Sequence, residues 1–197
     1  MIGSRPISEV RLHRDQEHTL IEHIDATARC LEPRAQLALI DAALRDGRLS
    51  PGDLSALKHG TLERRRWLIA RADARAESIS ETYARAALVD AGFRVVPQRA
   101  DGDGGRVDLV VEGAVVVELD GRSYHSNAAA FAGDRARDRR FIVLGMPTLR
   151  YTFMDVIRDS QQIVTDVEAV LFRLGRLTST VSNNLDRAAR VSRPWDR

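Results

Sequence analysis

The sequence predicts an α/β fold in which a small mixed β-sheet is flanked by helices in the order α-β-β-β-α-β-α and follows a helical N-terminal region. Two valine-rich runs, residues 106–111 and 115–120, are separated by a Glu-Gly turn signal and predict an antiparallel hairpin. Amphipathic helical patterns lie before and after the hairpin, and residues 148–153 alternate as a further strand. This order excludes an all-α fold and a β-sandwich.

Three carboxylates interrupt the apolar hairpin, namely Asp108, Glu118 and Asp120. A two-residue loop at 112–113 would place Asp108 and Glu118 on opposite faces of the sheet. A three-residue loop over 111–113, with Gly113 in the left-handed conformation, would instead place the three acids together on one face. Hydrophobic pattern favours this second register, because it gathers the apolar residues of both strands on the other face. These residues are Val107, Leu109, Val115, Val117 and Leu119.

Clustered carboxylates repel one another unless a cation lies among them, and hard oxygen ligands of this kind suit Mg²⁺ or Mn²⁺. The alternative is that the acids are ordinary surface residues on a sheet with one exposed face. Gly121 permits a sharp exit from the strand, and His125 follows shortly afterwards. This continuation favours a metal site.

The order of these motifs resembles the very-short-patch-repair-like branch of the PD-(D/E)XK nuclease superfamily, over roughly residues 76 to 172. The resemblance is carried by Asp108, Glu118-Leu119-Asp120-Gly121, His125, the helix around residues 131–138, and Thr148-Leu149-Arg150-Tyr151-Thr152. It implies a restriction-endonuclease-like core and Mg²⁺-dependent hydrolysis of DNA phosphodiester bonds. Repair, defence against foreign DNA and toxin-antitoxin systems are all compatible biological settings.

The resemblance also implies a set of metal ligands. Asp108 and Glu118 would hold the ion with the backbone carbonyl of Leu119, and Glu81 on the preceding helix would border the site. Glu81 has a second interpretation, because Ser78-Ile-Ser-Glu81 is a capping-box pattern that closes a helix N-terminus. The two interpretations are compatible with each other.

One position departs from the superfamily pattern. Most members place a lysine two residues after the glutamate, whereas this chain has Asp120 there, and its single lysine is Lys58 in the N-terminal region. In the resembling branch a histidine follows the Asp-Gly pair, so His125 is expected to act as general acid or base. The alternative is that His125 simply ends a loop. The expected catalytic set is Asp108, Glu118, Asp120 and His125.

Arginines supply the expected DNA contacts. Arg135, Arg139 and Arg150 are placed near the site by the resemblance and would bind backbone phosphate. Arg135 and Arg139 also lie one helical turn apart beside a similar pair of aspartates, so surface ion pairs are the alternative. A second basic run, residues 64–75, would either follow phosphates or form an exposed face that links two domains.

The sequence divides into a helical region over 1–75, the nuclease-like domain over 76–174 and a flexible basic tail over 175–197. Helices are predicted at 17–31, 33–46 and 50–58, where prolines and capping residues mark the starts. These helices resemble the middle region of proteins related to type IV antitoxin regulators, in which a winged helix usually comes first. No segment here is long enough for a winged helix.

Composition restricts the function less sharply. The formal net charge of +2 by itself does not indicate a nucleic-acid-binding protein. The single cysteine excludes a disulfide framework. Because no signal peptide or apolar run of membrane length is present, we expect a cytoplasmic protein without a membrane partner. A metal-dependent DNA endonuclease is the function that the motifs favour. A catalytically degenerate nucleic-acid-binding or antitoxin-like regulator is the alternative, and the missing glycine loop disfavours a phosphotransfer enzyme.

Overall fold

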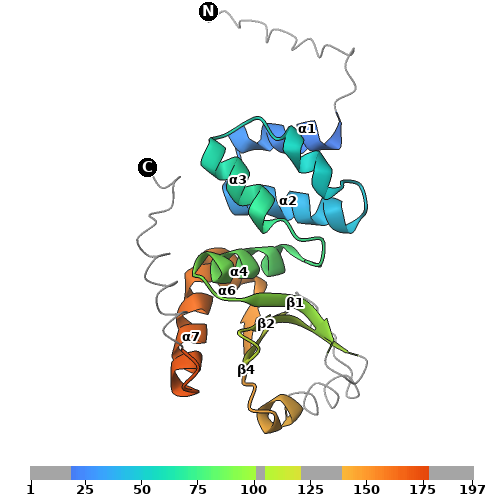
Figure 1. Cartoon of the computed structure of the whole chain (residues 1–197). Helices are drawn as coiled ribbons and strands as arrows, with labels where there is room; N and C mark the ends of the chain where they lie inside the picture. Colours follow the sequence, from blue (N-terminus) through green and yellow to red (C-terminus); the bar gives the residue numbers. More distant parts are fainter. Residues whose placement is uncertain (1–18, 101–104, 121–138, 178–197) are drawn as a thin grey trace, which may run out of the picture.

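The computed structural model describes residues 19–100, 105–120 and 139–177. Its N-terminal part is helical (Figure 1). The elements are α1 (Leu20–Ala26), the 3₁₀ turn η1 (Thr27–Arg29), α2 (Pro33–Arg45), the 3₁₀ helix η2 (Pro51–Ala56) and α3 (Leu62–Arg71). They enclose an apolar cluster around Leu37 and Ile40, which are fully buried.

Prolines and capping residues in the sequence predict where these helices begin. The predicted start of α2 is confirmed, because Pro33 is its first residue and the Glu32 side chain accepts the N–H groups of Arg34 and Ala35. The predicted cap-then-proline start at Ser50 and Pro51 is confirmed, and Ser50 also forms a capping box with Asp53, although the helix that follows is 3₁₀ and not α-helical. The predicted helix over 17–31 is shorter than expected, since α1 ends at Ala26 and continues as a 3₁₀ turn.

The second part contains a four-stranded mixed sheet with helices beside it, as predicted. In chain order it comprises α4 (Ile79–Asp90), β1 (Val95–Ala100), β2 (Arg106–Val111), β3 (Val115–Asp120), β4 (Thr148–Thr152), α6 (Phe153–Arg158) and α7 (Ser160–Arg173). The strands lie in the order β1-β2-β3-β4, with β1, β2 and β3 antiparallel and β4 parallel to β3. A helical stretch over 139–143 precedes β4.

The predicted hairpin register is wrong, because the three-residue turn lies one residue later in the chain than expected. Val111 pairs with Val115, so the three-residue loop is Glu112–Ala114 and not 111–113. Glu112 and Gly113 take φ values of 52° and 64°, and the Ala114 N–H closes the turn by donating to the Val111 carbonyl at 2.9 Å. This loop keeps Val111 in the strand, where it also pairs with Val95 of β1 and is fully buried.

Both faces of the sheet carry apolar residues. One face packs against α4 and α7 through Leu109, Val111, Val115, Val117 and Leu119, as the sequence predicts for these residues. Val107 was expected with them, but it packs with Val110, Val116 and Phe141 in a separate cluster. Val107 and Leu109 are two residues apart and should share a face in a regular strand. The alternation of β2 is therefore broken at Asp108, which lies between them.

The long C-terminal helix predicted over 155–174 is two helices, α6 and α7. Asp159 separates them with φ −151° and ψ 79°, which is not helical, and its carboxylate accepts the Gln161 N–H as the cap of α7. The apolar periodicity continues across this break, so the pattern predicted one element. Ile163 and Val167 of α7 are buried against the sheet.

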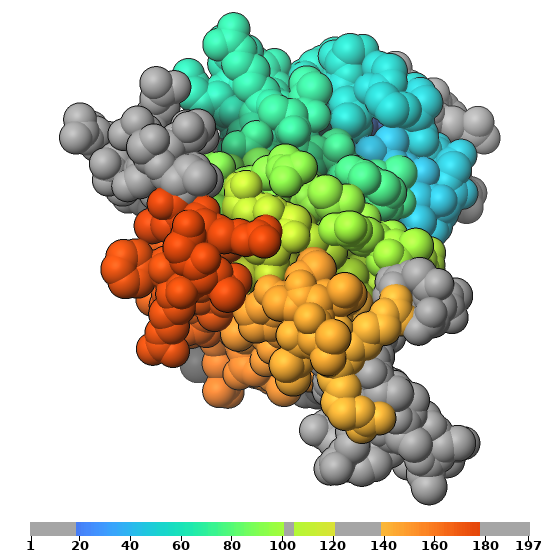
Figure 2. All heavy atoms as spheres, turned by 60° about the horizontal axis from the view of Figure 1, so that its bottom comes forward, coloured from blue at the N-terminus to red at the C-terminus, as the bar shows by residue number. Residues whose placement is uncertain are grey.

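Helix α4 connects the two parts of the molecule. Figure 1 shows it between the N-terminal helices and the sheet, and in Figure 2 the green residues of α4 and β1 lie between cyan N-terminal helices and orange C-terminal ones. Ala84 and Leu88 face the sheet cluster, whereas Ala86 packs with the N-terminal helices. One buried ion pair also crosses this boundary, since Arg85 Nη2 of α4 lies 2.7 Å from Asp41 Oδ2 of α2.

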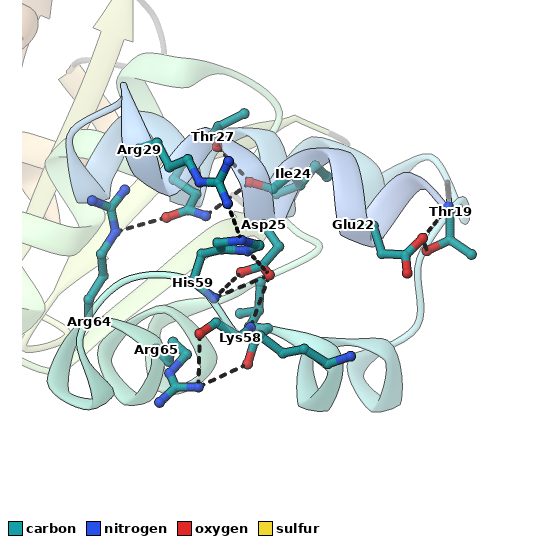
Figure 3. Close-up of polar contacts among 12 residues, drawn as sticks. Thr19, Glu22, Ile24, Asp25, Thr27, Arg29, Lys58, His59, Arg64 and Arg65 are labelled. Atoms are coloured by element: carbon teal, nitrogen blue, oxygen red, sulfur yellow. Dashed lines mark hydrogen bonds and ion pairs between the residues drawn. The ribbon is translucent and has the colours of Figure 1, made fainter. Parts of the chain in front are cut away.

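A second buried carboxylate organises the N-terminal helices (Figure 3). Asp25 is 4% exposed and accepts the backbone N–H groups of Lys58 and His59, each at 3.0 Å. His59 Nδ1 lies 2.6 Å from the same carboxylate, and His59 Nε2 lies 2.9 Å from Arg29 Nη2. Because a guanidinium can only donate, Nε2 accepts and Nδ1 carries the proton. This network attaches the segment between η2 and α3 to α1.

Asp25→Asn is expected to lower stability by about 1–3 kcal/mol at pH 7 and by less near pH 3. Burial alone would raise the pKa of Asp25, but the hydrogen bonds from His59 and Lys58 bring it below its ordinary value of 3.8. A carboxyl whose pKa is lowered on folding stabilises the protein above its unfolded pKa and loses that effect as pH falls. Urea unfolding at both pH values measures the difference, and a gap that widens in acid would contradict the prediction.

Candidate active site

Glu118 is the centre of the candidate site. It lies on β3, an inner strand of the sheet, and is only 8% exposed. Its neighbours Val117 and Leu119 face the main core, and its partner on the parallel strand β4 is Arg150. The interpretation of Glu118 as an ordinary surface residue is therefore wrong. A carboxylate in such a position needs compensation by hydrogen bonds or by a cation.

Asp108 comes from the adjacent strand β2 and reaches across to β3. Its Oδ2 accepts the backbone N–H of Leu119 at 2.7 Å, one residue from Glu118. The break of alternation at this residue means that sequence spacing cannot say which way its side chain lies, whereas the bond to Leu119 does. The Asp108 carboxylate is thus held at the β3 backbone beside Glu118.

Glu81 lies in the first turn of α4 and is 5% exposed. The expected capping box is half present. The Glu81 N–H donates to Ser78 Oγ at 3.2 Å, but the Glu81 carboxylate accepts the N–H of Glu77 at 3.0 Å in place of that of Ser78. Its second donor is Gln98 Nε2, at 2.8 Å. Glu81 therefore joins the N-terminus of α4 to the sheet as well as capping the helix.

Gln98 is the site residue that sequence reasoning missed. It lies in β1 and has φ 50°, in the left-handed region that non-glycine residues rarely occupy. Such a conformation costs about 1–3 kcal/mol, and the surrounding structure must maintain it. The preceding residue, Pro97, does not predict the left-handed backbone of Gln98. No signal in the sequence identified the residue.

The remaining predicted site residues are placed less closely. Asp120 ends β3 and is exposed, and its partner on β4 is Thr152. Arg139 and Arg150 are also exposed, so both are accessible to a polyanion. Their predicted phosphate contacts stay predictions. The other two predicted residues, His125 and Arg135, lie outside the described residues.

Within residues 19–100, 105–120 and 139–177, no group of three or more His, Cys, Asp or Glu side chains is arranged to hold a metal ion. The expected three-acid cluster is thus not assembled there. Asp108 binds the Leu119 N–H, and Asp120 lies exposed at the strand end. The donor set still fits Mg²⁺, which commonly takes one or two protein carboxylates and completes its shell with water and substrate phosphate.

Two arginines at the start of α3, Arg64 and Arg65, make hydrogen bonds within the N-terminal part. Arg64 donates to Gln36 Oε1 at 2.9 Å and to the backbone carbonyls of Ala28 and Leu31. Arg65 donates to the carbonyls of residues 57 and 58. Because both guanidiniums satisfy carbonyl groups inside the N-terminal part, the structure favours a structural role for these two arginines.

Comparisons with protein-family models, with curated proteins and with solved structures gave no match to this chain. Among the described residues, no helix is both long and apolar enough to cross a membrane. The chemistry of the site is therefore read from its own residues.

Proposed function

We propose that this chain is a metal-dependent endonuclease that hydrolyses DNA phosphodiester bonds. The supporting observation is the pair of carboxylates on neighbouring strands, Glu118 buried on β3 and Asp108 held at the β3 backbone next to it. The described elements around this pair follow the α-β-β-β-α-β-α order that the resemblance implies, except that the last helix is divided into α6 and α7. Carboxylates on adjacent strands are typical ligands of a divalent cation, and this pair therefore supports a cation-dependent function.

The residues have distinct roles in this proposal. Asp108 and Glu118 would hold Mg²⁺ or Mn²⁺, with the Leu119 carbonyl as a further ligand and Glu81 at the border. A divalent ion bound there polarises a phosphodiester oxygen and lowers the pKa of a bound water. Arg150, which is exposed and pairs with Glu118 in the sheet, would meet the negative charge of a phosphate.

Proton transfer is assigned by resemblance to residues near the end of β3. Asp120 occupies the position where most members of the superfamily carry lysine, so a lysine does not orient the water in this chain. The single lysine, Lys58, belongs to the N-terminal helical part, where its N–H binds Asp25. His125 would serve as general acid or base, because the pKa of a histidine lies near neutral pH.

A nucleic-acid-binding regulator without catalysis is the second candidate. The lack of a three-acid metal group among the described residues favours it. Exposed Arg139 and Arg150 would still bind phosphate in such a protein, and that binding would weaken with salt in both cases. Salt dependence therefore does not separate the two functions, whereas metal dependence does.

The decisive experiment incubates the protein with single-stranded, double-stranded and mismatched DNA in Mg²⁺, Mn²⁺ or EDTA. We expect cleavage that requires the metal and falls more than about 100-fold in Glu118→Gln, which removes the charge but keeps the volume of this buried side chain. Glu63→Gln, a change at an exposed glutamate of α3, is the matched control and should cleave normally. DNA binding without cleavage, unaffected by EDTA and by Glu118→Gln, would establish the regulator instead.

A further inference from the structure

Gln98 lies where the side chains of the paired strands β1 and β2 change from one face of the sheet to the other. On one side of it Pro97 pairs with Leu109, which packs against α4, and on the other side Arg99 pairs with Val107, which packs in the opposite cluster. The change of face occurs at the position of Gln98 and Asp108. Gln98 is therefore opposite the predicted metal ligand of β2 in the ladder.

The left-handed backbone of Gln98 determines what its side chain can reach. Val95, three residues earlier in β1, packs in the cluster that α4 covers. Regular alternation would put Gln98 on the other face, away from α4. With φ 50° the side chain instead donates to Glu81 Oε2 of α4 at 2.8 Å. An unfavourable backbone conformation thus coincides with this one contact.

The contact fixes Glu81 without neutralising it. Oε2 accepts both Gln98 Nε2 and the Glu77 N–H, and within the part of the chain that the structure describes Oε1 accepts no hydrogen bond. An amide donor orients a carboxylate but leaves its charge, unlike the guanidinium of an arginine. A second link holds α4 near the start of β2, since Arg106 Nη2 lies 2.8 Å from Glu77 Oε1.

From this geometry we infer that Gln98 is a positioning residue, which orients the Glu81 carboxylate so that its remaining oxygen serves the water shell of the divalent ion. The inference rests on the proposed nuclease function and adds a residue to that site. Side chains that hydrogen-bond to metal ligands in this way hold those ligands in place, and their loss weakens metal binding. A left-handed glutamine that only tied α4 to β1 would leave metal affinity unchanged.

The test titrates the full chain with Mn²⁺ alone and follows the free ion by electron paramagnetic resonance. We expect Gln98→Gly, which tolerates the left-handed backbone but lacks the amide, to bind Mn²⁺ about 10–100-fold more weakly at similar thermal stability. Gln98→Asn should behave alike, because asparagine also adopts this backbone but its shorter side chain does not span the distance. Arg106→Ala removes the ion pair between β2 and Glu77, just before α4, and should retain the affinity.

The outcomes separate the two proposals. Wild-type affinity in Gln98→Gly and Gln98→Asn, together with lost binding in Glu118→Gln, would overturn the positioning role and leave the metal site intact. A wild-type chain that does not bind Mn²⁺ would overturn the metal-dependent function and, with it, the role of Gln98. An equal loss of affinity in Arg106→Ala would assign the effect to packing of α4 and would also overturn the inference.

Discussion

Asp41→Ala is expected to lower the free energy of unfolding by about 3–5 kcal/mol, because it leaves the buried Arg85 guanidinium without its charge partner. The Asp41 and Arg85 side chains are 1% and 5% exposed and connect α2 to α4. Asp41 also accepts the Asp73 N–H and the Thr82 hydroxyl, at 2.8 and 2.7 Å. One substitution therefore leaves donors unsatisfied on both sides of the boundary between the two parts.

Burial raises the pKa of Asp41, and the Arg85 charge and the hydrogen bonds from Asp73 and Thr82 oppose that effect. Each member of this buried pair therefore needs the other to compensate its charge. Asp46→Ala is the matched control, since Asp46 at the end of the same helix pairs with Arg45 at the surface and should contribute less than about 1 kcal/mol. Urea unfolding measures both variants. A loss of equal size in the two would show that the buried pair is not a principal connection.

Asp108→Asn is expected to reduce Mg²⁺-dependent DNA cleavage by more than about 100-fold, since even outer-shell changes at metal sites cost 10–100-fold. The substitution removes the negative charge that a cation requires. It keeps a side-chain oxygen that can accept the Leu119 N–H, now bound at 2.7 Å, so stability should change by less than about 1 kcal/mol. The substitution therefore distinguishes the effect of Asp108 on cleavage from its effect on stability.

Two comparisons complete this prediction. Asp108→Ala removes the hydrogen bond as well, so it should lose both cleavage and stability. Asp155→Asn changes an aspartate whose carboxylate likewise accepts a backbone N–H, that of Thr152 at 2.8 Å, at the start of α6 and should leave cleavage intact. Cleavage rates and unfolding curves for the three variants provide the measurement. Normal cleavage by Asp108→Asn would remove Asp108 from the site.

Local chemistry made much of the fold predictable from the sequence. Pro33 and the Ser50-Asp53 box mark helix starts because the first backbone N–H groups of a helix need partners close in the chain. The order of helices and strands and the hairpin follow from hydrophobic periodicity and from the Glu-Gly turn. The same periodicity predicts Glu118 as a candidate site residue, because an acid in a valine-rich strand contradicts the pattern around it.

Other features were decided only in the folded chain. The loop at Glu112–Ala114 depends on how Val111 packs between β1 and β3. Arg64 of α3 reaches its carbonyl partners, Ala28 of η1 and Leu31, only in the folded chain. Gln98 takes its left-handed backbone at the point where its side chain donates to Glu81 of α4, which no neighbour in sequence specifies. Periodicity and capping report interactions within a few residues, so they give the elements and their order. Contacts between elements set the register, the break at Asp108 and the geometry of the carboxylates.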